Sequence, residues 1–212
     1  LSSIGVPNAI SKLVAERTAK GDHKGAIRIF KVALATFAII GLVGTLLLFF
    51  GADIIATYWL NIPEAKYTLI TLSPAVFFVT VAAVLRGYCN GKQAMRVTAR
   101  SQTLEQVFKT VLVIIIVEIV YKMTNGNTVW MAAAANVATT LSIFMSFMYL
   151  VRFYRITRTE RAKELKETVN YKYQNVKSIV KKILSVSIPM SLSSIMSSFN
   201  KNIDSFTVVS GL

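Results

Sequence analysis

Polar side chains follow one stripe of the last segment of the chain, residues 183–212. Spacings of four and three residues place six positions on one face of a helix: Ser187, Ser191, Ser194, Ser198, Lys201 and Ser205. Asn200 and Asp204 border this face, and Asp204 follows Lys201 by three residues. Hydroxyl, ammonium and carboxylate groups arranged in this way can bind a polar or anionic ligand through hydrogen bonds and ion pairs.

The charges of this stripe lie in an otherwise apolar segment. A charged side chain in the middle of a bilayer costs about 2.5–3.5 kcal/mol on insertion scales. The stripe is therefore expected to face a water-filled cavity, with Lys201 and Asp204 in its wall. The alternative is a contact with a partner helix, in which small residues pack closely and Lys201–Asp204 is an internal salt bridge.

A second charged pair, Lys12 and Glu16, lies one helical turn apart near the start of the chain. It follows Gly5 and Pro7, which are expected to bend or break a helix. Two interpretations stay open for this pair. It lines the cytoplasmic mouth of a cavity, or it lies at the level of the lipid headgroups.

A third charged group is the basic stretch 85–106, which separates two apolar segments. Its bases are Arg86, Lys92, Arg96 and Arg100, and Glu105 is its only acid. These bases can hold an anionic phosphate group, or they can fix the orientation of the chain and contact lipid headgroups. The second interpretation is favoured for Lys92 and Arg96. It is weaker for Arg86, which directly follows an apolar segment.

Patterns of catalytic residues are absent from the sequence. It contains no HExxH, GxSxG, P-loop or GxGxxG motif, and no close pair of acids inside an apolar segment. The single cysteine, Cys89, excludes an internal disulfide, and the single histidine, His23, argues against a histidine metal cluster. We expect a protein that is not an enzyme and that uses no cofactor and no metal.

Apolar segments dominate the chain. Hydrophobic residues make up 54% and charged residues only 16%, whereas soluble domains carry about 25% charged residues. Since about 20 apolar residues cross a bilayer as a helix, four segments are candidate membrane spans: Ala26–Phe50, Tyr67–Arg86, Leu104–Lys122 and Val129–Val151. The predicted fold class is an all-α, polytopic integral membrane helix bundle.

Positive charge alternates along the loops between these segments. Loops 12–31, 86–109 and 152–182 hold six, five and ten bases, whereas loops 51–66 and 121–128 hold one each. The positive-inside rule assigns the first three loops to the cytoplasm. We therefore attribute the net charge of +14 to membrane topology and not to binding of nucleic acid. A soluble helical protein would not separate its charges in alternate loops.

Three stretches of the sequence resemble one known family. LRGYCNGKQAMRVTARSQTLEQ, residues 85–106, is similar to the loop between the fourth and fifth helices of the stage V sporulation protein B group of polysaccharide transport proteins. The residues that carry this motif are Arg86, Gly87, Tyr88, Gly91, Gln93, Met95, Thr98, Ala99, Ser101, Gln102, Glu105 and Gln106. GVPNAISKLVAERTAKGD, which contains Pro7, resembles the group's second helix. IPMSLSSIMSSFNKNIDSF resembles the start of its seventh helix, with Pro189 and Asp204 at the expected places.

This group belongs to the multidrug/oligosaccharidyl-lipid/polysaccharide exporter superfamily, so the resemblance implies roughly one six-helix lobe of a two-lobe transporter. Residues 1–151 are then the membrane helices of the first lobe, 152–182 a basic cytoplasmic linker, and 183–212 the start of the second lobe. The chain is expected to be a fragment of a longer protein. Members of the group export or flip lipid-linked sugars, including peptidoglycan precursors, across bacterial plasma membranes.

The resemblance suggests an alternating-access mechanism for a lipid that carries a diphosphate and a sugar. Lys12, Arg86 and Lys201 are the candidate ligands of the diphosphate, with Asn200 beside them. Glu16 and Asp204 would keep the bases ionised and could couple transport to a cation or proton. The alternatives are a multidrug or cation antiporter of the same superfamily, a scaffold of an envelope-synthesis complex that transports nothing, and a membrane-embedded glycosyltransferase, for which no catalytic carboxylate is visible.

Overall fold

The computed structural model describes residues 5–59, 62–168 and 174–210; within α7, the side chains of residues 194, 195 and 197–210 are not described. Its elements are α1 (Gly5–Ala19), α2 (His23–Ile54), a π-helical turn (Ile55–Trp59), α3 (Ala65–Gly91), α4 (Met95–Thr124), α5 (Thr128–Ile156), α6 (Arg158–Lys166) and α7 (Val176–Ser210). Every regular element in these ranges is helical, which confirms the predicted all-α fold.

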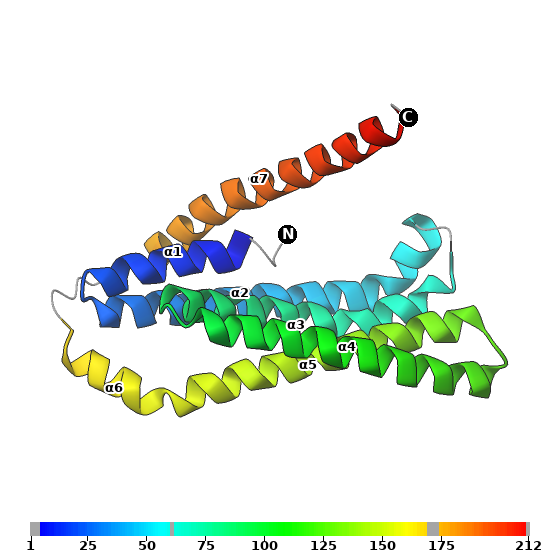
Figure 1. Cartoon of the computed structure of the whole chain (residues 1–212), viewed down its shortest axis with the longest axis horizontal. Helices are drawn as coiled ribbons and strands as arrows, with labels where there is room; N and C mark the ends of the chain where they lie inside the picture. The colour runs from blue at the N-terminus through cyan, green and yellow to red at the C-terminus, as the bar shows by residue number, and fades with distance from the viewer. Residues whose placement is uncertain (1–4, 60–61, 169–173, 211–212) are drawn as a thin grey trace.

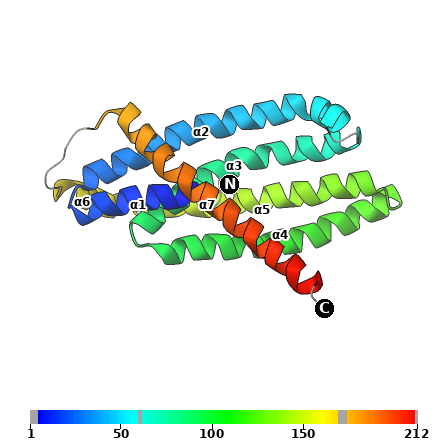
Figure 2. The same cartoon turned by 90° about the horizontal axis from the view of Figure 1, so that it is seen from above.

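Four long helices lie side by side in one layer, in the order α2, α3, α5, α4 (Figure 2). On one face of this layer, α1 packs against α2 and α3, and α7 packs on α1 and crosses the layer obliquely. The short helix α6 lies at one end, on the opposite side of the layer from α7 (Figure 1). The layer therefore has two distinct faces.

Bases of the three loops that were predicted to be cytoplasmic gather at one end of the layer. The start of α2, the turn between α3 and α4, and α6 all lie at this end (Figure 1). The π-helical turn and the turn between α4 and α5 lie at the other end. We call the first of these the basic end.

Three helical segments are long and apolar enough to cross a membrane: His23–Trp59, Ala65–Gly91 and Thr128–Ile156. They contain the spans predicted at 26–50, 67–86 and 129–151. The fourth predicted span, 104–122, lies within α4, whose apolar part is interrupted by Lys109, Glu118 and Lys122. That span stays a prediction, because the charges make α4 more polar than the other three helices.

Helix boundaries differ from the predicted ones in two of the loops. The predicted loop 51–65 is helical as far as Trp59. The basic stretch 85–106 is also largely helical, since α3 continues to Gly91 and only Lys92–Ala94 separate it from α4. Gly87 and Gly91 lie inside α3, where a neighbouring backbone comes close to each of them.

The predicted linker 152–182 is helical at both ends. α5 continues to Ile156, α6 follows at once, and α7 begins at Val176, before the predicted start at 183. Pro7 does not break α1, since the described residues Gly5–Ala19 form one helix that contains it.

Close contact between α1 and α3 depends on two glycines of α3. A Cβ atom at Gly87 would lie 2.8 Å from the carbonyl oxygen of Pro7. A Cβ atom at Gly91 would lie 2.7 Å from Cβ of Val14 and 2.8 Å from the carbonyl oxygen of Ser11. The two helices can pack at this distance only because neither glycine has a side chain.

Aromatic rings fill the core at the basic end. Phe30 of α2 lies 4.5 Å from Tyr88 of α3 and 5.0 Å from Tyr154 of α5, measured between ring centroids. Toward the other end, α2 exposes large apolar side chains, among them Leu47 and Phe50, which are 69% and 75% exposed. Such a surface suits contact with lipid or with further helices.

We predict that Gly87→Ala destabilises the protein by about 1–3 kcal/mol, the usual range for overpacking. Alanine normally stabilises a helix relative to glycine by up to about 1 kcal/mol, so the sign of the effect reports the α1–α3 contact. The measurement is the thermal unfolding midpoint of the purified protein. Gly44→Ala is the matched control, because its Cβ would meet only Val76 Cγ1 at 3.4 Å. An equal or higher midpoint for Gly87→Ala would contradict the prediction.

Candidate functional site

A partly buried ionic network joins three helices near the basic end. Arg86 of α3 forms an ion pair with Glu105 of α4, and the side chains are only 16% and 19% exposed. The same guanidinium nitrogen, Nη2, donates a hydrogen bond of 2.9 Å to Ser146 Oγ of α5. Ser146 Oγ in turn donates to the carbonyl oxygen of Ser101, also at 2.9 Å. The structure thus brings together two of the residues singled out in the sequence, Arg86 and Glu105.

Helix geometry explains how this network assembles. Ser101 and Glu105 are four residues apart and share one face of α4. Small buried side chains on α5, Ser142 and Ser146, allow α4 to approach closely. Since α4 begins at Met95, Glu105 lies inside the helix and not in its first turn. It compensates the charge of Arg86, not a helix dipole.

The guanidinium of Arg86 carries further donors on Nη1 and Nε, besides Nη2. Its Nε atom is buried and has no hydrogen-bond acceptor in the described part of the chain. An ion pair in a low-dielectric interior recovers its desolvation energy only when its remaining donors are also satisfied. The Arg86–Glu105 pair is therefore electrically neutral, but the buried Nε–H of Arg86 has no acceptor among the described residues.

On α1, Lys12 and Glu16 lie one helical turn apart but form no ion pair with each other. Lys12 is exposed and makes no ion pair with any described residue. Glu16 pairs with Lys20, four residues further along, at 2.8 Å. The hydrogen bond and positive charge of Lys20 lower the pKa of Glu16, so this carboxylate is ionised at neutral pH. It does not need Lys12 as a partner.

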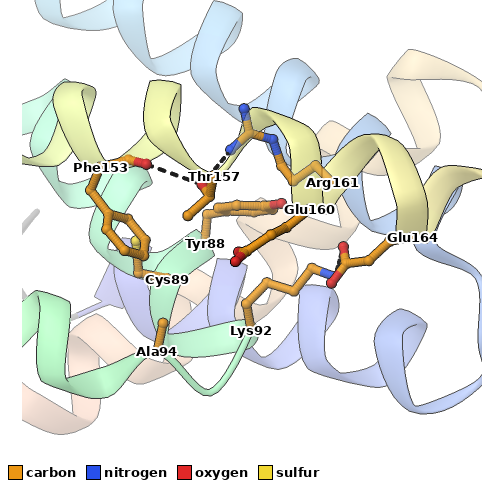
Figure 3. Close-up of a pocket in the computed structure, with 9 residues that line it drawn as sticks. All are labelled: Tyr88, Cys89, Lys92, Ala94, Phe153, Thr157, Glu160, Arg161 and Glu164. Carbon is orange, nitrogen blue, oxygen red and sulfur yellow. Dashed lines mark hydrogen bonds and ion pairs between the residues drawn. The ribbon is translucent and has the colours of Figure 1, made fainter.

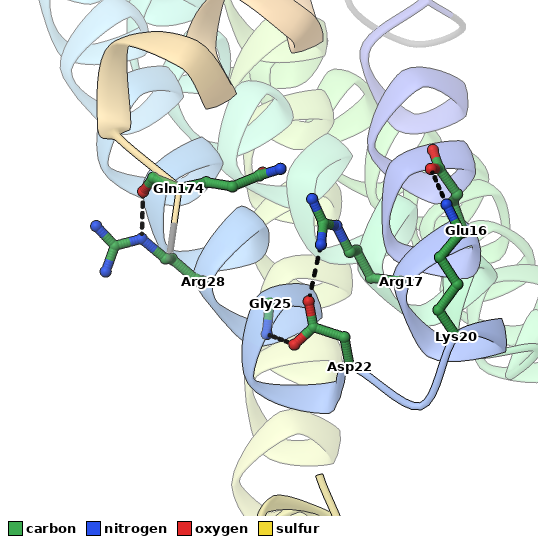
Figure 4. A network of polar contacts seen from close by, with 7 residues as sticks. All are labelled: Glu16, Arg17, Lys20, Asp22, Gly25, Arg28 and Gln174. Carbon is green, nitrogen blue, oxygen red and sulfur yellow. Dashed lines mark hydrogen bonds and ion pairs between the residues drawn. The ribbon is translucent and has the colours of Figure 1, made fainter. Parts of the chain in front are cut away.

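A neighbouring network holds the turn between α1 and α2 (Figure 4). Asp22, which is nearly fully buried, accepts a hydrogen bond of 2.7 Å from the backbone N–H of Gly25 and so caps α2. Arg17 binds the other oxygen of Asp22 at 2.9 Å. The sequence analysis did not single out Asp22. Its position just before an apolar helix is the signal that predicts a cap.

We call the junction of α5 and α6 the α5–α6 elbow. A pocket of about 150 Å³ lies between this elbow and the end of α3 (Figure 3). Lys92 donates to Glu164 of α6 at 2.7 Å and lies 3.4 Å from Nδ1 of His23. Arg161 donates to Thr157 Oγ1 at 2.7 Å, and its guanidinium lies 3.6 Å from the ring centre of Tyr154. Lys92, which was assigned to orientation and headgroup contact, thus fixes α6 to the turn between α3 and α4.

The polar stripe of the last segment lies on a helix, as predicted, since α7 extends from Val176 to Ser210. Its first two members face α1: a Cβ atom at Gly5 would lie 2.0 Å from Ser191 Oγ and 3.0 Å from the carbonyl oxygen of Ser187. At these positions the stripe therefore serves close packing of helices, the alternative interpretation. The side chains of Asn200, Lys201 and Asp204 lie outside the described residues.

Other residues of the family motif differ in their surroundings. Pro7, Gly87 and Gly91 lie buried at the contact between α1 and α3. Gln102 and Gln106 are exposed on α4. The motif therefore combines packing positions with surface positions.

We predict that Arg86→Gln destabilises the protein by about 3–5 kcal/mol, because it leaves the charge of Glu105 without its partner in a buried site. The double variant Arg86→Gln/Glu105→Gln should recover part of this loss, since it removes both charges. A double-mutant cycle on thermal unfolding midpoints measures the coupling. The exposed pair Glu118–Lys122 provides the control, with a coupling of about 0.3–0.5 kcal/mol. Additive effects at Arg86 and Glu105 would show that the pair contributes nothing.

Comparisons with known proteins give one consistent picture. The whole chain, residues 1–212, matches the family described as polysaccharide biosynthesis protein. It is 32% identical to the stage V sporulation protein B of Bacillus subtilis (strain 168) over 189 residues, which cover 89% of this chain and 35% of that protein. It is 25% identical to the lipid II flippase MurJ of the same organism over 158 residues, which cover 71% of this chain and 29% of that protein.

A solved structure shares the fold. It is the inward-facing conformation of a multidrug resistance MATE family transporter of the MOP superfamily, with a TM-score of 0.67 and 20% sequence identity over 89% of this chain and 41% of that one. The chain spans about a third of the length of the two curated relatives. On the match over its full length, the chain belongs to the polysaccharide biosynthesis protein family.

Proposed function

We propose that the protein containing this chain moves a lipid-linked sugar, or a polysaccharide or peptidoglycan precursor, across the bacterial plasma membrane. The observation that carries the proposal is the similarity of this chain to a lipid II flippase over 71% of its length. The fold supports it, because three of the helices can cross a membrane and the remaining elements pack along them. Transport requires no bond to be broken, which agrees with the lack of catalytic motifs in the sequence.

The basic end of the layer is the cytoplasmic side in this proposal. Loops 12–31, 86–109 and 152–182 supply the bases, and the segments they contain meet at one end of the bundle. Anionic lipids of the inner leaflet attract such a surface. A lipid-linked sugar made in the cytoplasm would therefore enter from the basic end and leave from the other by alternating access.

Lys12 is the strongest candidate among the described residues for a ligand of the cargo's diphosphate. It lies on α1, next to α7, the helix on which Lys201, Asn200 and Asp204 are found in the sequence. It has no anionic partner among the described residues, so an incoming diphosphate would supply one. A cation within a bundle recovers part of its desolvation energy only beside an anion.

Arg86 is a weaker candidate as a direct ligand. Its charge is already compensated by Glu105, and its Nη2 already binds both Glu105 and Ser146. A diphosphate could bind N–H groups of Arg86 other than those of Nη2, or it could displace Glu105 from the guanidinium. In the second case Glu105 would be released as the cargo binds, and it could take up a proton or cation. Glu16 and Asp204 are the other proposed acids for such coupling.

Neutralising Lys12 tests this site. We expect Lys12→Gln and Lys201→Gln each to lower the initial rate of translocation of a lipid-linked sugar in reconstituted vesicles by about ten-fold or more, because each removes a charge-assisted hydrogen bond worth about 1.5–3 kcal/mol. Lys24→Gln is the control, since Lys24 is an exposed base of the same end with no described ion pair. Rates equal to the control at equal protein levels would remove both lysines from the site. A wild-type protein that moves no lipid-linked sugar would refute the proposed function itself.

A further inference from the structure

Four bases line one pocket between α2 and the α5–α6 elbow, on the side away from Lys92. Lys31 comes from α2, Arg155 from the end of α5, and Arg158 and Arg161 from α6. The remaining lining residues are Ile27, Tyr154, Ala162 and Leu165, so no acid lines the pocket. Arg161 rests on Tyr154 and Thr157, whereas Lys31, Arg155 and Arg158 make no ion pair with any residue in the described ranges.

This pocket differs from the bases at the basic end that are paired with acids. Arg17, Arg86 and Lys92 each bind a carboxylate. The acids of α6 are not directed to the pocket: Glu164 binds Lys92, and both Glu160 and Glu164 line the cavity on the other side of the elbow. Figure 3 shows Arg161 turned away from Lys92 and Glu164. Four like charges around one hollow repel one another unless an anion lies between them.

Apolar stripes lead from these bases along the helices, which indicates what kind of anion fits. On α2, the stripe from Lys31 continues at spacings of four, four, three and four residues through Ala35, Ile39, Leu42 and Leu46, all of them exposed. On α5, the stripe from Arg155 leads back through Met148, Phe144, Leu141 and Val137, which are also exposed. A soluble anion would need only the bases. A lipid needs a cationic pocket for its headgroup and apolar surface for its chains.

We propose that this pocket binds the phosphate of an anionic phospholipid, with its acyl chains along the exposed stripes of α2 and α5. Lys31, Arg155 and Arg158 supply the charge, and Arg161, held on Tyr154, closes the pocket. Basic pockets at the cytoplasmic ends of membrane helices bind lipid headgroups in this way. The site is distinct from that proposed for the cargo, because α6 and α1 with α7 lie on opposite sides of the helix layer (Figure 1).

A bound phospholipid would also hold the elbow in place. α6 contacts the rest of the bundle mainly through α2 and α5, and the pocket lies between these elements. A phosphate shared by Lys31 on α2 and Arg158 on α6 would join them across the pocket. The lipid would thus stabilise the position of α6 while Lys92–Glu164 fixes the helix from the other side.

The test uses the full-length protein in nanodiscs that contain phosphatidylglycerol and phosphatidylcholine, with native mass spectrometry of the lipids that stay bound. Arg155→Gln/Arg158→Gln should lower the retention of phosphatidylglycerol by about five-fold for each base removed, since a base near the membrane surface contributes about 1 kcal/mol. Arg96→Gln/Arg100→Gln is the matched control, because these two arginines are exposed bases at the same end and line none of the pockets described above. The control should retain phosphatidylglycerol as the wild type does.

Three outcomes would overturn the proposal. An equal loss in the control would show that only the overall surface charge matters. Displacement of phosphatidylglycerol by millimolar glycerol phosphate would indicate a site for a soluble anion. Loss of undecaprenyl diphosphate binding, with phosphatidylglycerol retained, would assign the pocket to the cargo. In vesicles of phosphatidylcholine, the pocket variants are expected to translocate lipid-linked sugar at the wild-type rate. The lipid-retention test of the pocket is therefore independent of the translocation test of Lys12.

Discussion

The side chain of Arg86 reaches from α3 to α4 and α5, and the carboxylate of Glu105 stabilises its charge there. A guanidinium surrounded by apolar helices is stable only with an anion beside it. The same requirement accounts for the other described bases that are largely enclosed: Arg17 lies against Asp22, and Lys92 against Glu164. Lys12 and Lys31, which pair with no carboxylate among the described residues, are exposed. Arg161 is half-buried without a carboxylate and rests on the ring of Tyr154 instead. Pairing with an acid therefore marks the bases that join helices, whereas Lys12 and Lys31 are available to a ligand.

Packing of α1 determines which of its residues are free. Ile10 and Val14 point into the core, next to Gly87 and Gly91 of α3. Lys12 and Glu16 each follow one of these buried residues by two positions, and a step of two residues turns a helix by about 200°. The glycines bring α1 close to α3, and the close contact turns Lys12 outward. The exposure of Lys12 to a ligand is thus linked to Gly87 and Gly91 of α3, which carry no side chain and let α1 pack closely.

The helical fold and three of the spans could be predicted because length and hydropathy are local properties of the sequence. The motif residues Arg86 and Glu105 were also found in the sequence, but their pairing was not, because it depends on how α3 and α4 align across a three-residue turn. Lys92 was assigned to lipid headgroups for a similar reason. Its partner Glu164 is 72 residues away, and no local pattern indicates that contact. The packing role of Gly87 and Gly91 was not predicted either, because it depends on α1, a helix that is distant in the sequence.

Two anionic ligands are proposed for one chain, and the geometry explains how they can be kept apart. A diphosphate with a sugar must reach bases near α1 and α7, on one face of the layer. A phospholipid reaches Lys31, Arg155 and Arg158 from the surface beside α2 and α5, on the face where α6 lies. The aromatic cluster of Phe30, Tyr88 and Tyr154 fills the core at this end. Tyr154 belongs both to this cluster and to the lining of the basic pocket, so a headgroup bound there meets a packed wall and not a route to α1. Selectivity would follow from the direction of access, because both ligands present the same phosphate chemistry to the same kinds of side chain.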